Sequence, residues 1–145
     1  MKKIVAVSII VLFGGTAVAQ DDEGGVVPQS VIDAFSCLYP KITNVSWDVN
    51  DVNYSASFKL DAKSVSLDFD EYGNVTKVKS EIKLYELPPD VNHLISKEYS
   101  GWSIGRASHI DSFGTGYYET EIQKDQQNMV LVFNRHGGLM IKVML

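Results

Sequence analysis

The feature that most constrains this chain is an internal repeat. The segments LDFDEYGNVTK (67–77) and LVFNRHGGLMI (131–141) share one order. In each, a leucine is followed two positions later by a phenylalanine, then by polar residues, a glycine and residues that favour β-strands. Their glycines, Gly73 and Gly137, are 64 residues apart. Self-similarity at a fixed spacing indicates two copies of one supersecondary unit.

The repeat extends towards the N-terminus with a smaller spacing. Val27-Pro28 matches Leu87-Pro88 at an offset of 60 residues. The change from 60 to 64 is absorbed in DSFGTG (111–116), a glycine-containing segment typical of a loop. We therefore predict a single domain, 27–145, made of two repeats, 27–85 and 86–145.

Each repeat begins with a helix and continues with four strands. The segment PQSVIDAFSCLYP (28–40) places apolar residues on one helical stripe, and PPDVNHLISKEYSG (88–101) does the same. Strict alternation in VNYSASFKL (52–60) indicates a strand with a buried face and a solvent face. The predicted fold class is α+β, with two tandem helix-plus-four-strand repeats forming a continuous antiparallel sheet and both helices on one face.

The N-terminal segment MKKIVAVSIIVLFGGTAVAQ has a basic start, a short apolar run and a small-x-small motif at Ala17-Val18-Ala19. This pattern predicts a signal peptide over 1–19 and a flexible mature N-terminus over 20–26. The protein is then exported to the periplasm or secreted. No later segment is apolar enough to span a membrane. Cleavage would lower the formal net charge from −5 to −7, which disfavours nucleic acid as a partner.

Cys37 is the only cysteine, so the chain has no internal disulfide. Its position on the predicted helical stripe indicates a buried, inert thiol.

The repeated motifs resemble a known family. The helix ends in YP or YSG, and Y-x-A/T-x-F/I and V/L-x-F-D/N-x-x-G follow in both copies. This order is similar to that of the PepSY-like family of secreted bacterial proteins, described as resembling the β-lactamase-inhibitor protein in fold. The resemblance implies the tandem fold and a periplasmic or outer-surface location, but no functional residues. The chain departs from the repeat at Trp47 and Trp102, which occupy different places in the two copies.

Metal and cofactor chemistry finds little support in the spacing of the polar residues. His93, His109 and His136 fall in a helix, a strand and a turn, without the paired spacing of a metal site. Asp48 and Asp51 are the leading candidates for calcium, although the D-x-D-x-D-G spacing of a calcium loop is missing. We predict no cofactor, with calcium as the alternative.

Catalytic groups are also poorly placed. Ser108, His109 and Asp111 are close in sequence, but neighbouring strand residues point to opposite faces. Glu119 and Glu121 share a strand face, where an open sheet offers no enclosed pocket. The prediction is that the protein is not an enzyme.

The solvent face of the sheet remains as the candidate site. Polar residues interspersed with aromatic and apolar ones are typical of a protein contact surface. An alternative is that the N-terminal tail or a loop covers the two valines of this face. The predicted protein-binding face consists of Ser55, Ser57, Lys59, Tyr117, Glu119, Glu121, Val130 and Val132.

The leading functional hypothesis is a non-catalytic, secreted or periplasmic binding module that recognises a protein or peptide of the cell envelope, as an inhibitor or an accessory. The alternatives are a calcium- or small-ligand-sensing envelope protein and an envelope structural protein without a discrete ligand. The partner and the oligomeric state are left open.

Overall fold

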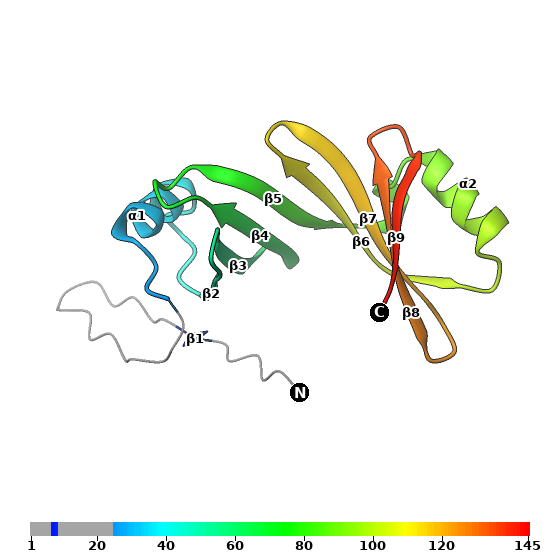
Figure 1. Ribbon diagram of the computed structural model, residues 1–145, viewed down its shortest axis with the longest axis horizontal. Helices are drawn as coiled ribbons and strands as arrows, with labels where there is room; N and C mark the ends of the chain where they lie inside the picture. The colour runs from blue at the N-terminus through cyan, green and yellow to red at the C-terminus, as the bar shows by residue number, and fades with distance from the viewer. Residues whose placement is uncertain (1–6, 9–24) are drawn as a thin grey trace. The chain divides into compact units, whose positions relative to one another are not determined.

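The computed structural model describes residues 7–8 and 25–145, and the chain divides into two compact units between Val78 and Lys79 (Figure 1). The first unit contains β1 (Val7–Ser8), α1 (Gln29–Leu38), β2 (Val45–Val49), β3 (Tyr54–Leu60), β4 (Lys63–Phe69) and the first half of β5 (Val75–Ile82). The second contains the rest of β5, the 3₁₀ turn η1 (Leu84–Glu86), α2 (Pro89–Glu98), β6 (Ser103–Ser112), β7 (Thr115–Lys124), β8 (Gln127–Asn134) and β9 (Leu139–Met144).

The strands are neighbours in chain order, from β1 to β9, and the registers are antiparallel. Two-residue turns close the β3–β4, β6–β7 and β7–β8 hairpins, which is why consecutive strands pair antiparallel. The predicted α+β class, with two helices that each precede four antiparallel strands, is confirmed.

The predicted signal peptide lies outside the described residues apart from Val7 and Ser8. These two residues pair with Trp47 and Ser46 of β2. The predicted mature N-terminus is described only from Gly25 onward.

Both helices start directly after proline. Pro28 precedes α1 in an extended conformation, and Pro88 takes the same place before α2. Because Pro has no backbone N–H, it fits where a helix has unsatisfied donors in any case. Pro40 follows the end of α1, since the residue before a proline disfavours helical geometry.

The first unit has an aromatic core between α1 and its strands. Phe35 of α1 contacts Tyr39, Trp47 and Phe58, with ring centroids 5.7, 5.5 and 5.3 Å away. The pairs with Trp47 and Phe58 are edge-on, and such pairs add to the free energy of burial. The remaining buried core residues are Val27, Val31, Val45, Ala56, Val65, Leu67 and Phe69.

The core of the second unit is mostly aliphatic. Ala107 stands opposite Thr120 in the β6–β7 register, where the first unit has Trp47 opposite Ala56. Trp102 lies after α2 and packs edge-on against Tyr99 instead. The buried core residues are Leu87, Val91, Ile95, Ala107, Ile122, Leu131 and Phe133.

A glycine turn contacts the first turn of the helix in each unit. Gly73 and Gly137 have positive φ angles of 87° and 86°. A Cβ on Gly73 would lie 2.7 Å from the carbonyl oxygen of Ser30, and one on Gly137 would lie 2.8 Å from Cβ of Asp90. Only glycine permits both this backbone conformation and this close approach.

The burial prediction for Cys37 was wrong. Cys37 is exposed, and the neighbouring Leu38 is 53% exposed. The buried residues of α1 are Val31 and Phe35, one turn apart, so the covered stripe is narrower than the apolar pattern indicated.

Replacing either turn glycine should destabilise the protein more than a positive φ alone explains. We expect Gly73→Ala and Gly137→Ala to lower the free energy of unfolding by about 2–4 kcal/mol, the sum of left-handed strain and steric overlap. Gly114→Ala is the matched control, because Gly114 also has positive φ (77°) but no heavy atom lies within 4 Å of its Cβ position. Urea unfolding measures the free energy of unfolding of the three variants. An equal loss in all three would show that the close approach to the helix does not contribute.

The buried hydroxyl group of Thr120 should lower the free energy of unfolding of the protein. Its side chain is fully buried and Oγ1 has no hydrogen-bond partner. Thr120→Val keeps the shape and should raise the free energy of unfolding by about 1 kcal/mol. Thr120→Ser keeps the hydroxyl, removes a methyl group and should lower it. The interpretation fails if thermal unfolding shows Thr120→Val to be less stable than the wild type.

Candidate functional site

Each unit has an open face, defined here as the side of its strands turned away from its own helix and core. The cores fix which residues lie on it, because side chains alternate along a strand. Ser55, Ser57 and Lys59 of β3 alternate with the buried residues Ala56 and Phe58, so they belong to the open face of the first unit.

The open face of the first unit satisfies much of its polarity internally. Ser55 Oγ donates to Asp68 Oδ1 at 2.7 Å, and Lys77 Nζ lies 2.8 Å from Asp68 Oδ2. Lys59 Nζ donates to Ser64 Oγ at 2.6 Å. Asp68 is only 6% exposed because these neighbours cover it. This face therefore offers a partner few unsatisfied groups.

The second open face combines acidic and apolar residues. Glu119 stands opposite Val132, and Glu121 stands opposite Val130 in the β7–β8 register. Tyr117 follows on the same side of β7 and is partly buried, as the other four are. The structure therefore brings these five predicted residues together on two adjacent strands.

The neighbouring strand β9 enlarges the apolar part of this face. Val143 pairs with Val130, and Ile141 pairs with Val132. Ile141 and Val143 are 53% and 47% exposed. We refer to Val130, Val132, Ile141 and Val143 as the apolar patch. The alternative that the tail or a loop covers the two valines is not tested by the described residues.

Sequence reasoning missed Ile141 and Val143 because of a β-bulge. The register shifts between Val132 and Phe133, so that Leu139 pairs with Phe133 and Ile141 with Val132. Leu139 consequently packs on the core while Ile141 faces the other way. Plain alternation would put both on one side, and the sequence contains no strong signal for the bulge.

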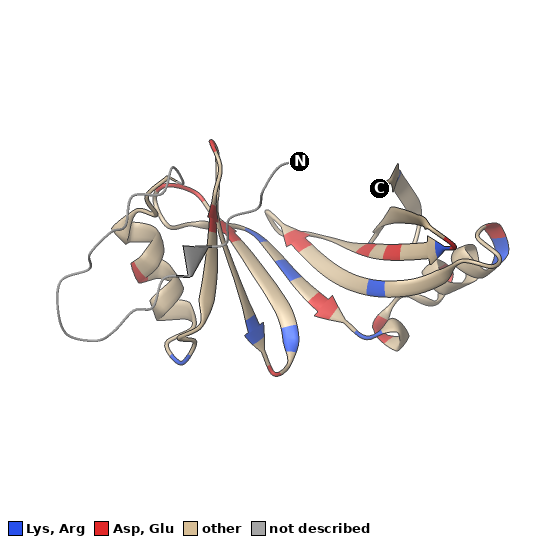
Figure 2. Cartoon of the chain, turned by 90° about the horizontal axis from the view of Figure 1, so that it is seen from below, with Lys and Arg blue, Asp and Glu red and all other residues tan. Residues whose placement is uncertain are grey.

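Glu119 has a partner within its own unit. Lys79 of β5 forms a salt bridge with it, and the charged residues along these strands are marked in Figure 2. The ion pair spans β6, where Ser108 stands opposite Glu119 and is only 4% exposed. A small residue at this position leaves room for the lysine side chain. Glu119 thus forms the polar border of the apolar patch.

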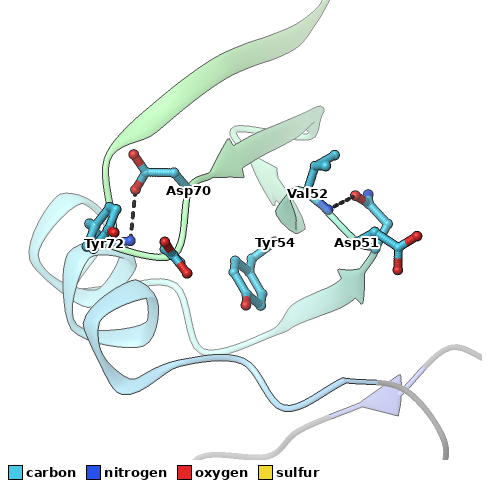
Figure 3. Close-up of a pocket in the computed structure, with 7 residues that line it drawn as sticks. Asp51, Val52, Tyr54, Asp70 and Tyr72 are labelled. Atoms are coloured by element: carbon cyan, nitrogen blue, oxygen red, sulfur yellow. Dashed lines mark hydrogen bonds between the residues drawn. The ribbon is translucent and has the colours of Figure 1, made fainter.

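The calcium candidates are separated in the structure. Asp51 lines a shallow cavity of about 290 Å³ at the tips of the β2–β3 and β4–β5 hairpins (Figure 3). Asp48 does not line this cavity and stands opposite Ser55 on the open face. Across residues 7–8 and 25–145, no three His, Cys, Asp or Glu side chains gather as a metal site. The cavity is lined by Asn50, Asp51, Val52, Tyr54, Asp70, Glu71 and Tyr72.

The carboxylate of Asp70, which lines this cavity, accepts hydrogen bonds from residues of its own turn. Its Oδ1 accepts the backbone N–H groups of Tyr72 and Asn74, and its Oδ2 accepts the side-chain amide of Asn74. The Asn74 side-chain and backbone bonds lower the pKa of Asp70 below its ordinary value of 3.8. Tyr72 has a raised pKa, caused first by its hydrogen bond to Glu71.

The histidines stay apart, as their sequence positions indicated. His93 is in α2, His109 is in β6 and His136 is in the β8–β9 turn. His109 packs edge-on against Tyr118, with ring centroids 5.2 Å apart. None of the described helices is long and apolar enough to cross a lipid bilayer.

Comparison with known proteins places the fold but not a function. No family model and no curated protein matches the chain. Among solved structures, a protein from Bacteroides eggerthii proposed to be periplasmic has a TM-score of 0.75 at 18% identity, covering 83% of this chain and 90% of that one. A DUF2874 family protein from Bacteroides uniformis has a TM-score of 0.73 at 20% identity, covering 81% and 88%.

A third similar structure is a BLIP-like protein from Bacteroides fragilis. Its TM-score is 0.69 at 24% identity, with 87% of this chain and 92% of that chain covered. The chain therefore has a BLIP-like fold, in agreement with the predicted inhibitor-like architecture. The comparisons provide no support for the PepSY-like family itself.

The Asp70 turn predicts an acid-dependent contribution to stability. The folded-state pKa lies below the ordinary value of 3.8, so this contribution is present above pH 3.8 and disappears as the pH falls through the folded-state pKa. Asp70→Asn should therefore be less stable than the wild type at pH 6, with a difference that shrinks towards pH 2.

A natural control exists in the second unit. Asn134 Oδ1 accepts the N–H groups of His136 and Gly138 in the same geometry, so an asparagine supports this turn. Asn134→Ala should give a loss of stability that does not change over the same pH range. Denaturant titrations at several pH values measure both, and a pH-independent difference for Asp70→Asn would contradict the assignment.

Proposed function

We propose that this chain is a non-catalytic binding module of the bacterial envelope that recognises a protein or peptide through the open face of its second unit. The observation that carries the proposal is the apolar patch. Ile141 and Val143 remain about half exposed on a sheet that buries its other side under α2. Exposed apolar residues gathered on one face, with a polar border, mark surfaces for protein contact.

The composition of this face supports a protein partner. Tyr117, Glu119 and Glu121 lie on β7 along one side of the apolar patch, so an aromatic ring and acidic groups border an apolar centre there. Fully buried interface centres are apolar, while their rims are polar. On the open face of the first unit, Ser55 donates to Asp68 and Lys59 donates to Ser64, which makes this face the weaker candidate.

Location and chemistry are part of the same proposal. The N-terminal pattern favours export, and one similar structure is of a protein proposed to be periplasmic. The similar structures are named as DUF2874 family and BLIP-like proteins, and none of these names describes an enzyme. We infer that this chain is likewise located in the bacterial envelope and is not an enzyme.

The proposal predicts that charges on the apolar patch abolish binding. Immobilised protein is exposed to envelope extract of the producing bacterium, and bound proteins are identified. We expect Ile141→Asp and the double variant Tyr117→Ala/Val132→Asp to reduce capture at least tenfold, because a buried unpaired carboxylate opposes association.

Tyr85→Ala is the matched control, since Tyr85 is 78% exposed and belongs to η1, not to the strands that carry this face. Circular dichroism confirms that each variant is folded. Capture that survives Ile141→Asp and the double variant, in folded protein, would show that this face is not the binding surface.

A further inference from the structure

The tip of the β6–β7 hairpin combines an exposed aromatic ring with an unfavourable backbone. Phe113 and Gly114 form a two-residue loop, with φ angles of 50° and 77°. Two positive φ angles at the centre of a hairpin loop are those of a type I′ turn. The Phe113 side chain is 83% exposed, more than any other large apolar residue of the described chain.

Phenylalanine is a poor choice for this turn. Type I′ turns favour Asn, Asp or Gly, because bulky residues are strained at positive φ. The chain uses aspartate where other hairpin turns need the same conformation, at Asp61 and Asp125. Phe113 therefore bears both backbone strain and the exposure of its ring to water.

Among the described residues, little packs against this tip, and the Phe113 side chain is 83% exposed. A Cβ at the neighbouring Gly114 would meet no heavy atom within 4 Å, so the tip lies in open space. Residues held in sparsely populated backbone conformations cluster at functional sites. This observation singles out Phe113 independently of the apolar patch.

The β6–β7 hairpin is long and is paired up to its turn. β6 and β7 are 10 residues each, against 5 and 7 for β2 and β3 in the first unit (Figure 1). Pairing continues to the last step, with Ser112 opposite Thr115, and Asp111 Oδ1 accepts the N–H of Gly114 at 3.0 Å. The four residues gained between the two repeats fall here, so the longer copy carries the aromatic tip.

We infer that Phe113 is an anchor that inserts into a concave apolar pocket on a folded protein partner. The inference rests on the proposed binding function and adds a second contact point to it. Buried aromatic side chains commonly dominate the binding energy of protein interfaces. Glu119 is paired with Lys79, and Glu121 stands opposite Arg106. Asp111 is therefore the charged residue next to the tip, so the rim of the pocket should be neutral or basic.

A membrane is the less suitable partner for this tip. One phenyl ring is much smaller than a myristoyl chain, which by itself gives only marginal membrane binding. The chain also has a formal net charge of −5, which opposes approach to anionic lipid surfaces. A protein pocket, in contrast, encloses the ring and adds further contacts around it.

The test is site-specific photocrosslinking in the producing cell. The full chain carries p-benzoylphenylalanine at Phe113, at Tyr117 or, as control, at the exposed Tyr85. We expect position 113 to form a crosslink to one protein, with the attached peptide in a concave apolar pocket of that protein, and position 85 to form none. Attachment of position 113 to lipid, or to a flat polar surface, would overturn the inference.

The two positions separate this inference from the proposed function. A crosslink at Tyr117 without one at Phe113 removes the anchor and leaves the binding face intact. If neither position crosslinks, both proposals fail together.

The variant Phe113→Asn separates a role in binding from a role in stability. Asparagine suits a type I′ turn, so the variant should unfold about 2–4 °C higher than the wild type. The same variant should bind the crosslinked partner at least tenfold more weakly. A variant that is less stable, or that binds as the wild type does, would contradict the anchor.

Discussion

The fold depends on one backbone contact that occurs in each unit, between a glycine turn and the start of a helix. The last hairpin turn of each unit lies against the first turn of its helix, at Gly73 in one case and Gly137 in the other. Ser30 strengthens the first contact by donating its hydroxyl to the carbonyl oxygen of Glu71. This contact helps to hold each helix against the strand face that carries the apolar core residues.

Much of the fold could be predicted because the signals are local and repeated. Alternation in β3 correctly separated Ala56 and Phe58 from Ser55 and Ser57, and the paired glycines marked the turns. The bulge at β9 could not be predicted, because it depends on how the strand pairs with β8. For the same reason the sequence revealed only half of the apolar patch.

Burial of individual polar and strained residues was harder to predict. Cys37 lies on an apolar helical pattern, yet the helix covers only Val31 and Phe35. Asp68 alternates towards solvent, yet Ser55 and Lys77 enclose it. Phe113 was assigned to a loop, and its positive φ becomes visible only in three dimensions. Such features arise from contacts or backbone angles that residue patterns do not encode.

The two units use the same architecture for different purposes. Aromatic packing and self-satisfied polar groups make the first unit the more inert one. In the second, the described residues leave an apolar patch and the β6–β7 hairpin tip exposed, and the buried Thr120 hydroxyl has no hydrogen-bond partner among them. The features suited to binding therefore gather in one unit, whose counterpart in the first repeat lacks them.

Methyl-resolved NMR of the full chain tests the central claim most directly, with envelope extract of the producing bacterium as the titrant. The account predicts that the methyl signals of Val130, Val132, Ile141 and Val143 shift or broaden, while those of the buried residues Val31 and Val65 do not. Unchanged signals across the apolar patch, or changes confined to the first unit, would contradict it.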